Sequence, residues 1–117
     1  MTPDAVPPPA KSGAAAAYRR QLTAKQMEAE VFARCTRAIR AAEAGSALDR
    51  ARAVADNRRL WDAVGTSVGH RSNALPQPLR AGLAQLALTV LRECDADEPD
   101  LGFIAEMNEH IAAGLWR

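Results

Sequence analysis

Apolar side chains recur at alternating steps of three and four residues through most of this chain, and that spacing constrains the fold more than any other feature. On an α-helix, the spacing aligns side chains on one face. The clearest series are Val54, Asn57, Trp61, Val64 and Val68; Leu79, Leu83, Leu86 and Val90; and Leu101, Ile104, Asn108, Ile111 and Leu115. No stretch of useful length alternates apolar and polar residues as a β-strand would. The chain is therefore predicted to be all-α.

Residue types typical of helix ends divide the first half of the chain into two helices. A capping box begins at Thr23, and Gly45 is a favourable stop for the helix that follows it. Ser46 and Asp49 form a second capping-box sequence, which predicts a helix over about 47–68.

Two further helices are predicted in the second half. Leu75 and Pro76 open the third, with Pro76 or Pro78 in its first turn, where a missing N–H costs nothing. Asp97 is a candidate cap for the fourth helix, with Pro99 in its first turn. The expected fold is a small four-helix bundle with short connections.

The N-terminal region has a different composition. Residues 1–10 contain four of the seven prolines, so this stretch cannot form a helix and buries little. We predict a disordered or frayed tail over 1–22 and a single helical domain over 23–117. A chain of 117 residues fits one such domain.

Charge and cysteine content favour an ordinary cytoplasmic protein. The formal net charge is +1, which is too small to indicate nucleic-acid binding by itself. The N-terminal residues lack the apolar core of a secretory signal, and no apolar run approaches the ~20 residues of a membrane span. Cys35 and Cys94 are expected to be small buried apolar residues rather than a disulfide.

No motif indicates catalysis. His70 and His110 are the only histidines, and neither lies three or four residues from another metal-ligating His or Cys. The chain has no glycine-rich phosphate loop and no nucleophile elbow. We therefore expect no enzymatic activity, no metal, no cofactor and no small-molecule substrate.

Asn57 and Asn108 each interrupt one of these apolar series, and we call the helix face that such a series forms its seam. An unpaired amide in a buried seam costs about 1–3 kcal/mol. In one interpretation each fixes helix register by bonding the other or a backbone carbonyl. In the other, one of them lines a groove and binds a partner's backbone.

Arg58 and Arg59 directly follow Asn57 and also allow two interpretations. Arg58 borders the seam and could pair with Asp62 on a solvated face, whereas Arg59 points away from the seam. Alternatively, the two arginines bind acidic groups at a protein interface, where Arg is enriched.

Leu88 and Phe103 fall outside the apolar seams of their helices. Single exposed apolar residues are ordinary. Together with Trp116 at the end of the chain, however, they could form a contact patch.

Three blocks of sequence carry a resemblance to a known family. Residues 57–61 read N-R-R-L-W, residues 75–80 contain L-P and L-R, and residues 108–115 read N-x-x-I-A-A-G-L. In order and spacing, the chain over 14–117 resembles the FlaF family of alphaproteobacterial flagellar proteins. The predicted partner-binding residues are Asn57, Arg58, Arg59, Trp61, Leu88, Phe103, Asn108, Ile111 and Leu115.

The resemblance implies a role in flagellin production and export, together with the partner regulator FlbT. Family members are understood to bind flagellin in the cytoplasm, which implies a site covering an amphipathic helical segment of flagellin. We expect an apolar cleft lined by Leu83, Leu86, Trp61, Ile104 and Ile111, or by their neighbours. The alternatives are a post-transcriptional regulator of flagellin mRNA acting with FlbT, for which direct nucleic-acid contact is not expected, and a dimeric structural adaptor.

Overall fold

The computed structural model describes residues 16, 29–70 and 73–115. Within these residues the chain is helical between its connections and contains no strand. The helices are, in chain order, a first helix described over 29–42, α2 (Ala47–Gly69), α3 (Gln77–Cys94) and α4 (Leu101–Leu115). The all-α prediction is confirmed, whereas the predicted tail over 1–22 and the predicted helix start at Thr23 lie outside the described residues.

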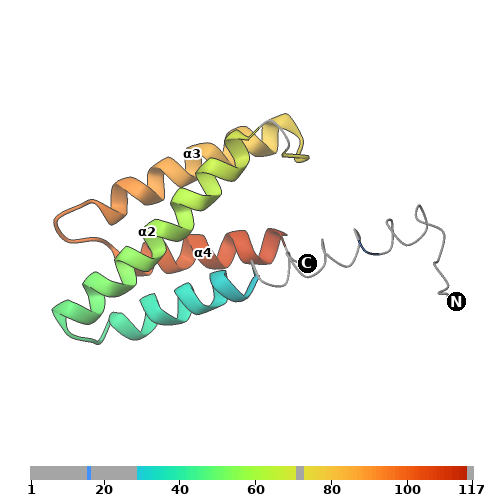
Figure 1. Ribbon diagram of the computed structural model, residues 1–117. Helices are drawn as coiled ribbons and strands as arrows, with labels where there is room; N and C mark the ends of the chain where they lie inside the picture. The colour runs from blue at the N-terminus through green and yellow to red at the C-terminus, as the bar shows by residue number, and fades with distance from the viewer. Residues whose placement is uncertain (1–15, 17–28, 71–72, 116–117) are drawn as a thin grey trace, which may run out of the picture.

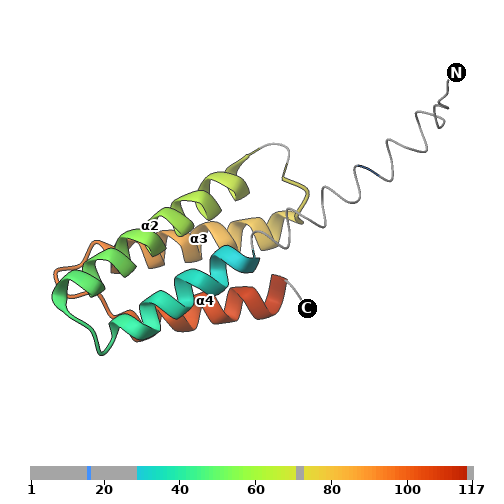
Figure 2. The ribbon, with the colours of Figure 1, turned by 60° about the horizontal axis from the view of Figure 1, so that its bottom comes forward.

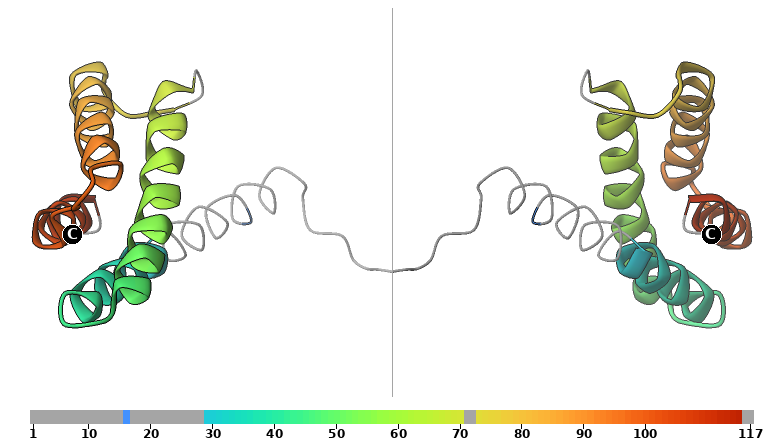
Figure 3. Two further views of the ribbon diagram at one scale, coloured as in Figure 1. Left: turned by 90° about the vertical axis from the view of Figure 1, so that its left-hand side faces the viewer. Right: turned by 90° about the vertical axis from the view of Figure 1, so that its right-hand side faces the viewer.

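Successive helices run in opposite directions and form an incomplete ring (Figure 1). Seen from the end of the molecule, α2 lies between α3 and the first helix, and α4 lies beside the first helix (Figure 3). Packing is extensive between α2 and α3 but slight between α3 and α4. The ribbons of α3 and α4 accordingly run well apart in Figures 1 and 2. The side of the bundle between α3 and α4 is therefore less closed than the side between α2 and α3.

The core lies where the seams predicted from the sequence meet. It consists mainly of aliphatic residues, and Trp61 is its largest fully buried side chain. The Trp61 ring packs edge-on against Phe32 of the first helix, with 6.0 Å between ring centroids. The buried members are Phe32, Cys35, Ile39, Ala42, Ala53, Leu60, Trp61, Val68, Leu83, Ala87, Val90, Cys94, Ile104 and Ala105.

The start of α2 has the predicted capping box. The Asp49 backbone N–H donates to the Ser46 hydroxyl at 3.1 Å, and the Ser46 N–H donates to the Asp49 carboxylate at 3.1 Å. Gly45 does not have the positive φ of a helix-terminating glycine. It is needed for space instead, because a Cβ there would lie 2.9 Å from the Asp49 carboxylate.

The capping box predicts an acid-dependent contribution to stability. The bond from the Ser46 backbone N–H, and then the bond with its hydroxyl, lower the pKa of Asp49 below its ordinary 3.8. A carboxyl whose pKa falls on folding stabilises the folded state above its unfolded pKa, and this contribution disappears as the pH falls through the folded pKa. Asp49→Ala should therefore be less stable than wild type at neutral pH and lose that deficit near pH 2, on the same reasoning. Urea unfolding followed by circular dichroism at both pH values tests this, and a deficit unchanged at low pH would contradict it.

The later helix starts agree only partly with prediction. Pro76 caps α3 and a proline occupies its first turn, as expected. The start predicted for α4 is wrong: Asp100, not Asp97, accepts the hydrogen bond from the Phe103 N–H at 3.0 Å, and Pro99 precedes the helix. Both aspartates suit a cap by type, and only the path of the connection selects Asp100, whose own N–H is held by Glu93 at 2.9 Å.

Arg80 closes the connection between α2 and α3. Its Nε donates to the Val68 carbonyl at 3.0 Å, and its Nη2 donates to the His70 carbonyl at 3.2 Å. These carbonyls lie at the end of α2, where the helix dipole favours a cation. Arg80 lies in one of the recognised blocks, but its local sequence did not predict this role, because the two carbonyls lie 10 and 12 residues away.

Candidate functional site

A chain of buried side-chain hydrogen bonds joins three helices through the centre of the molecule. The Trp61 indole N–H donates to Asn108 Oδ1 at 2.8 Å, and Asn108 Nδ2 donates to Asn57 Oδ1 at 2.6 Å. Asn57 Nδ2 then donates to the carbonyls of Cys35, at 3.2 Å, and Ala53, at 2.9 Å. We call Trp61, Asn108 and Asn57 the polar relay.

The polar relay matches the register interpretation of the two asparagines. Asn57 bonds both the other asparagine and backbone carbonyls, and all three side chains are fully buried. A hydrogen-bonded amide is tolerated in an apolar core, whereas a shifted helix would leave it unpaired. The relay therefore holds α4 against α2 and the first helix in one register. Because its three side chains are buried, the relay can affect partner binding only by positioning exposed residues.

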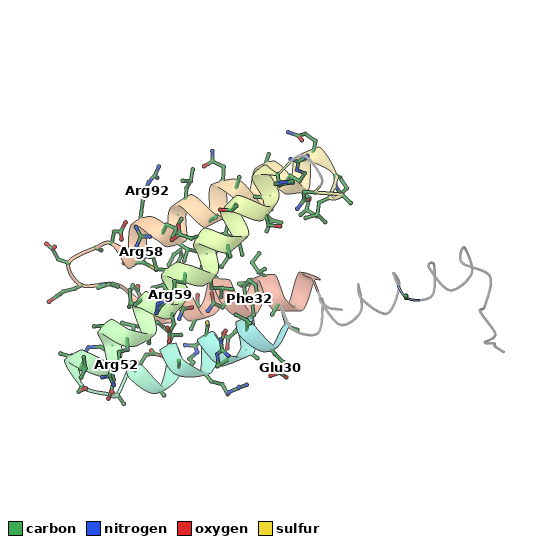
Figure 4. All side chains as sticks on the ribbon, viewed as in Figure 1. Glu30, Phe32, Arg52, Arg58, Arg59 and Arg92 are labelled. Atoms are coloured by element: carbon green, nitrogen blue, oxygen red, sulfur yellow. The ribbon has the colours of Figure 1, made fainter. Side chains whose placement is uncertain are left out.

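Arg58 and Arg59 lie on different sides of α2. Arg58 pairs with Asp62 at 3.3 Å and with Asp95, at the end of α3, at 3.0 Å. Figure 4 shows it on the side of α2 toward α3. Arg59 pairs with Asp56 at 3.1 Å, and its charge acts on the Cys35 thiol, which places it toward the first helix. The two guanidinium groups therefore do not form one fork.

The side of the molecule formed by the first helix and α2 carries several arginines, labelled in part in Figure 4. Arg34, Arg37 and Arg52 are exposed and have no ion pair within the described part of the chain. Acids such as Glu30, Asp49 and Asp56 lie near these arginines on the same two helices, so this surface is only moderately basic.

Leu79 and Leu88 point to opposite sides of α3. They are nine residues apart, which at 100° per residue is half a turn in projection. Leu79 is 45% exposed and Leu88 is 49% exposed. Leu88 lies on the side of α3 opposite the buried Leu83 and Val90, whereas Leu79 lies on their side, near the start of the helix.

Partly exposed apolar side chains gather on the less closed side of the bundle. Those of α4 are spaced four apart, on the side away from the first helix, which contacts α4 through the Arg40–Glu109 pair at 2.7 Å. Those of α3 lie away from Ala87, which faces Gly65 of α2. We call this set the α3–α4 surface: Leu79 and Leu86 of α3, and Phe103, Met107 and Ile111 of α4.

The expected apolar cleft is partly wrong. Trp61 and Ile104 are fully buried and Leu83 is 5% exposed, so these three residues belong to the core and do not line an accessible site. Leu86 and Ile111 are half-buried and belong to the α3–α4 surface. Of the predicted partner-binding residues, the structure thus brings Phe103 and Ile111 together. The side chain of Leu115 lies outside the described residues.

The titratable side chains nearest the core are the two cysteines. Cys35 and Cys94 are free and buried, as predicted. Burial raises the pKa of the Cys35 thiol, and it raises that of Cys94 to about 11, so both remain protonated at neutral pH. Over the described residues, no three His, Cys, Asp or Glu side chains are grouped to hold a metal ion.

Comparisons with known proteins agree with the recognised blocks. A family model described as flagellar protein FlaF matches residues 10–115 of the 117-residue chain. Comparison with curated proteins and with solved structures gives no match. None of the described helices combines the length and apolar character needed to cross a membrane. The match spans the whole helical bundle, including the polar relay and the α3–α4 surface, and the chain therefore belongs to the FlaF family of flagellar proteins.

Proposed function

We propose that this protein binds flagellin and thereby supports flagellin synthesis and secretion during flagellum assembly. The observation that carries the proposal is the α3–α4 surface, where apolar side chains of two helices stay partly exposed on one side. An amphipathic helix of flagellin would bury its apolar face there, in the manner of helix-in-groove recognition. The bound segment would be shielded until export.

Burial is the driving force of this binding. Transfer of a Leu, Ile, Phe or Met side chain from water to a full apolar contact contributes about 1.5–3 kcal/mol. The side chains of the α3–α4 surface are already half-covered, so each has only part of that to gain. Several of them acting together offset the cost of ordering a flexible segment. The polar relay supports the site by fixing α4, which carries three of the five side chains.

The matched pair Leu79 and Leu88 provides the test. Leu79→Glu places a charge on the α3–α4 surface and should weaken binding of purified flagellin monomer at least about tenfold, a loss of about 1.4 kcal/mol. Leu88→Glu makes the same change on the same helix at nearly the same exposure, but on the opposite side. It should bind as wild type does. Isothermal titration calorimetry measures both, and circular dichroism checks that each variant keeps the helical fold.

Each outcome of this test is informative. Absence of wild-type binding at micromolar concentration would overturn the proposed function. Loss of binding in Leu88→Glu alone would move the site to the side formed by α2 and α3, where Arg58 also lies.

A second candidate function is regulation of flagellin mRNA together with FlbT. The observation that favours it is the group of exposed arginines on the first helix and α2, of which Arg34, Arg37 and Arg52 lack ion pairs in the described structure. Phosphate contacts would make any RNA affinity fall steeply with salt. Flagellin binding through the α3–α4 surface would change much less, so a salt titration separates the two functions.

A further inference from the structure

A glycine lies within the α3–α4 surface although the fold does not require one there. Gly82 is exposed, and a Cβ built on it would meet nothing within 4 Å. It lies between Leu79 and Leu86 on the same side of α3, since the three positions fall within about 60° in projection. Glycine inside a helix is destabilising relative to alanine. Its known advantage, close approach of another backbone, finds no use among the described residues.

Acidic side chains border one end of the same surface. Glu93 faces the connection between α3 and α4, because it accepts the Asp100 N–H at 2.9 Å. Asp97 and Glu98 of that connection are exposed and have no ion pair within the described residues. Among the described residues, the opposite end of the surface, at Leu79 and Ile111, has no comparable cluster of acids. The surface is therefore apolar along its length and negative at one end.

We infer that the α3–α4 surface receives an amphipathic α-helix of a partner protein, packed closely over Gly82 and carrying basic residues at the end beside the α3–α4 connection. This inference rests on the proposed function and gives the bound segment its chemistry and direction. The acidic side chains of the α3–α4 connection would attract the basic end of the bound helix and so set its direction. The missing side chain at Gly82 lets the two helix axes approach more closely than a larger residue would allow.

The dimensions of the surface set the length of the bound helix. Phe103 and Ile111 of α4 are eight residues apart, and Leu79 and Glu93 of α3 are fourteen apart, which corresponds to about 12 Å and 21 Å of helix. A partner helix of about three to four turns would cover this length. Its apolar stripe would contact both helices, and a small residue or a backbone segment would lie over Gly82.

The close contact is tested by adding side chains at Gly82. Gly82→Ala should raise the Tm of the free protein by about 2–8 °C, because alanine is the better helix former and nothing obstructs its Cβ. Gly82→Leu should weaken binding of purified flagellin monomer at least about tenfold. The control is Ala81→Leu, which places the same leucine side chain at the adjacent exposed position, points away from the surface and should leave binding unchanged.

The basic end is tested by charge reversal. Asp97→Lys combined with Glu98→Lys should weaken flagellin binding about five- to tenfold at low salt, with a smaller effect at high salt because exposed charges are screened. The control is Glu30→Lys combined with Glu106→Lys, which changes the net charge equally at exposed positions away from the connection. Equal losses in both double variants would indicate a general charge effect and overturn the basic-end assignment.

The outcomes separate this inference from the proposed function. If wild-type protein binds flagellin and Gly82→Leu binds equally well, the close contact is overturned while the proposed function stands. If wild-type protein does not bind flagellin, the proposed function itself fails. If sedimentation shows a wild-type dimer that Gly82→Leu dissociates, the occupant is a second copy of this chain and the inference is overturned.

Discussion

Replacing Asn108 with leucine should lower the free energy of unfolding by about 2–5 kcal/mol, because two buried groups would lose their partners. Asn108 accepts the Trp61 indole N–H and donates to Asn57 Oδ1, and all three side chains are fully buried. Each orphaned donor or acceptor costs about 1–3 kcal/mol. Leucine adds no partner for either group.

Urea unfolding followed by far-UV circular dichroism measures this loss. Gln85→Leu is the matched control, since Gln85 is an exposed polar residue of α3 with no side-chain hydrogen bond within the described residues. Its effect should stay within about 0.5 kcal/mol. A loss in Asn108→Leu no larger than in the control would show that the polar relay is not maintained in solution.

A double substitution tests whether the relay acts as one unit. Asn57→Leu combined with Asn108→Leu removes both amides, so their mutual hydrogen bond leaves neither partner orphaned. The combined loss should therefore be smaller than the sum of the two single losses, as expected for residues in one network. Strict additivity would mean that the asparagines contribute independently.

The helices could be predicted because each one repeats its signal several times. The seam of α2 runs from Val54 to Val68 at steps of three and four. Misjudging one of its residues would not change the helix face that the whole series predicts to be buried. Helix ends depend on one or two residues, so the prediction is less secure there. At α4, Asp97 and Asp100 have equal chemistry, and only the fold decides which of them caps the helix.

The candidate site could be predicted only in part. Asn57 and Asn108 break the apolar seams visibly, so their importance could be inferred from sequence. Their hydrogen bond to each other joins residues 51 positions apart, and the link to Trp61 joins residues 47 apart. No local pattern contains such pairings. For the same reason, Trp61 was predicted from the sequence to line an accessible cleft, although the fold buries it completely.

The α3–α4 surface could not be predicted without knowing which helix faces stay uncovered in the fold. Leu79 and Leu83 belong to the same seam, yet Leu79 is 45% exposed and Leu83 is 5% exposed. The seam predicts that both face inward. Their difference arises because α3 packs on α2 but only slightly on α4, which is a property of the arrangement of the helices.

Trp61→Ala should lower the free energy of unfolding by about 3–5 kcal/mol, as expected for truncation of a buried aromatic side chain. Trp61 is the largest fully buried residue and packs edge-on against Phe32. Small domains are stable by only about 5–15 kcal/mol, so this variant loses a large share of its stability.

Trp61→Phe separates the two contributions of this side chain and keeps the prediction testable if the alanine variant does not fold. Phenylalanine retains an aromatic ring beside Phe32 but cannot donate to Asn108 Oδ1. The loss should be about 1–3 kcal/mol if one orphaned acceptor dominates, and clearly smaller than in Trp61→Ala. A loss close to zero in Trp61→Phe would show that packing of the aromatic ring, and not the indole hydrogen bond, sets the stability. In that case the relay would fix helix register through the two asparagines alone, because Asn57 and Asn108 would still bond each other.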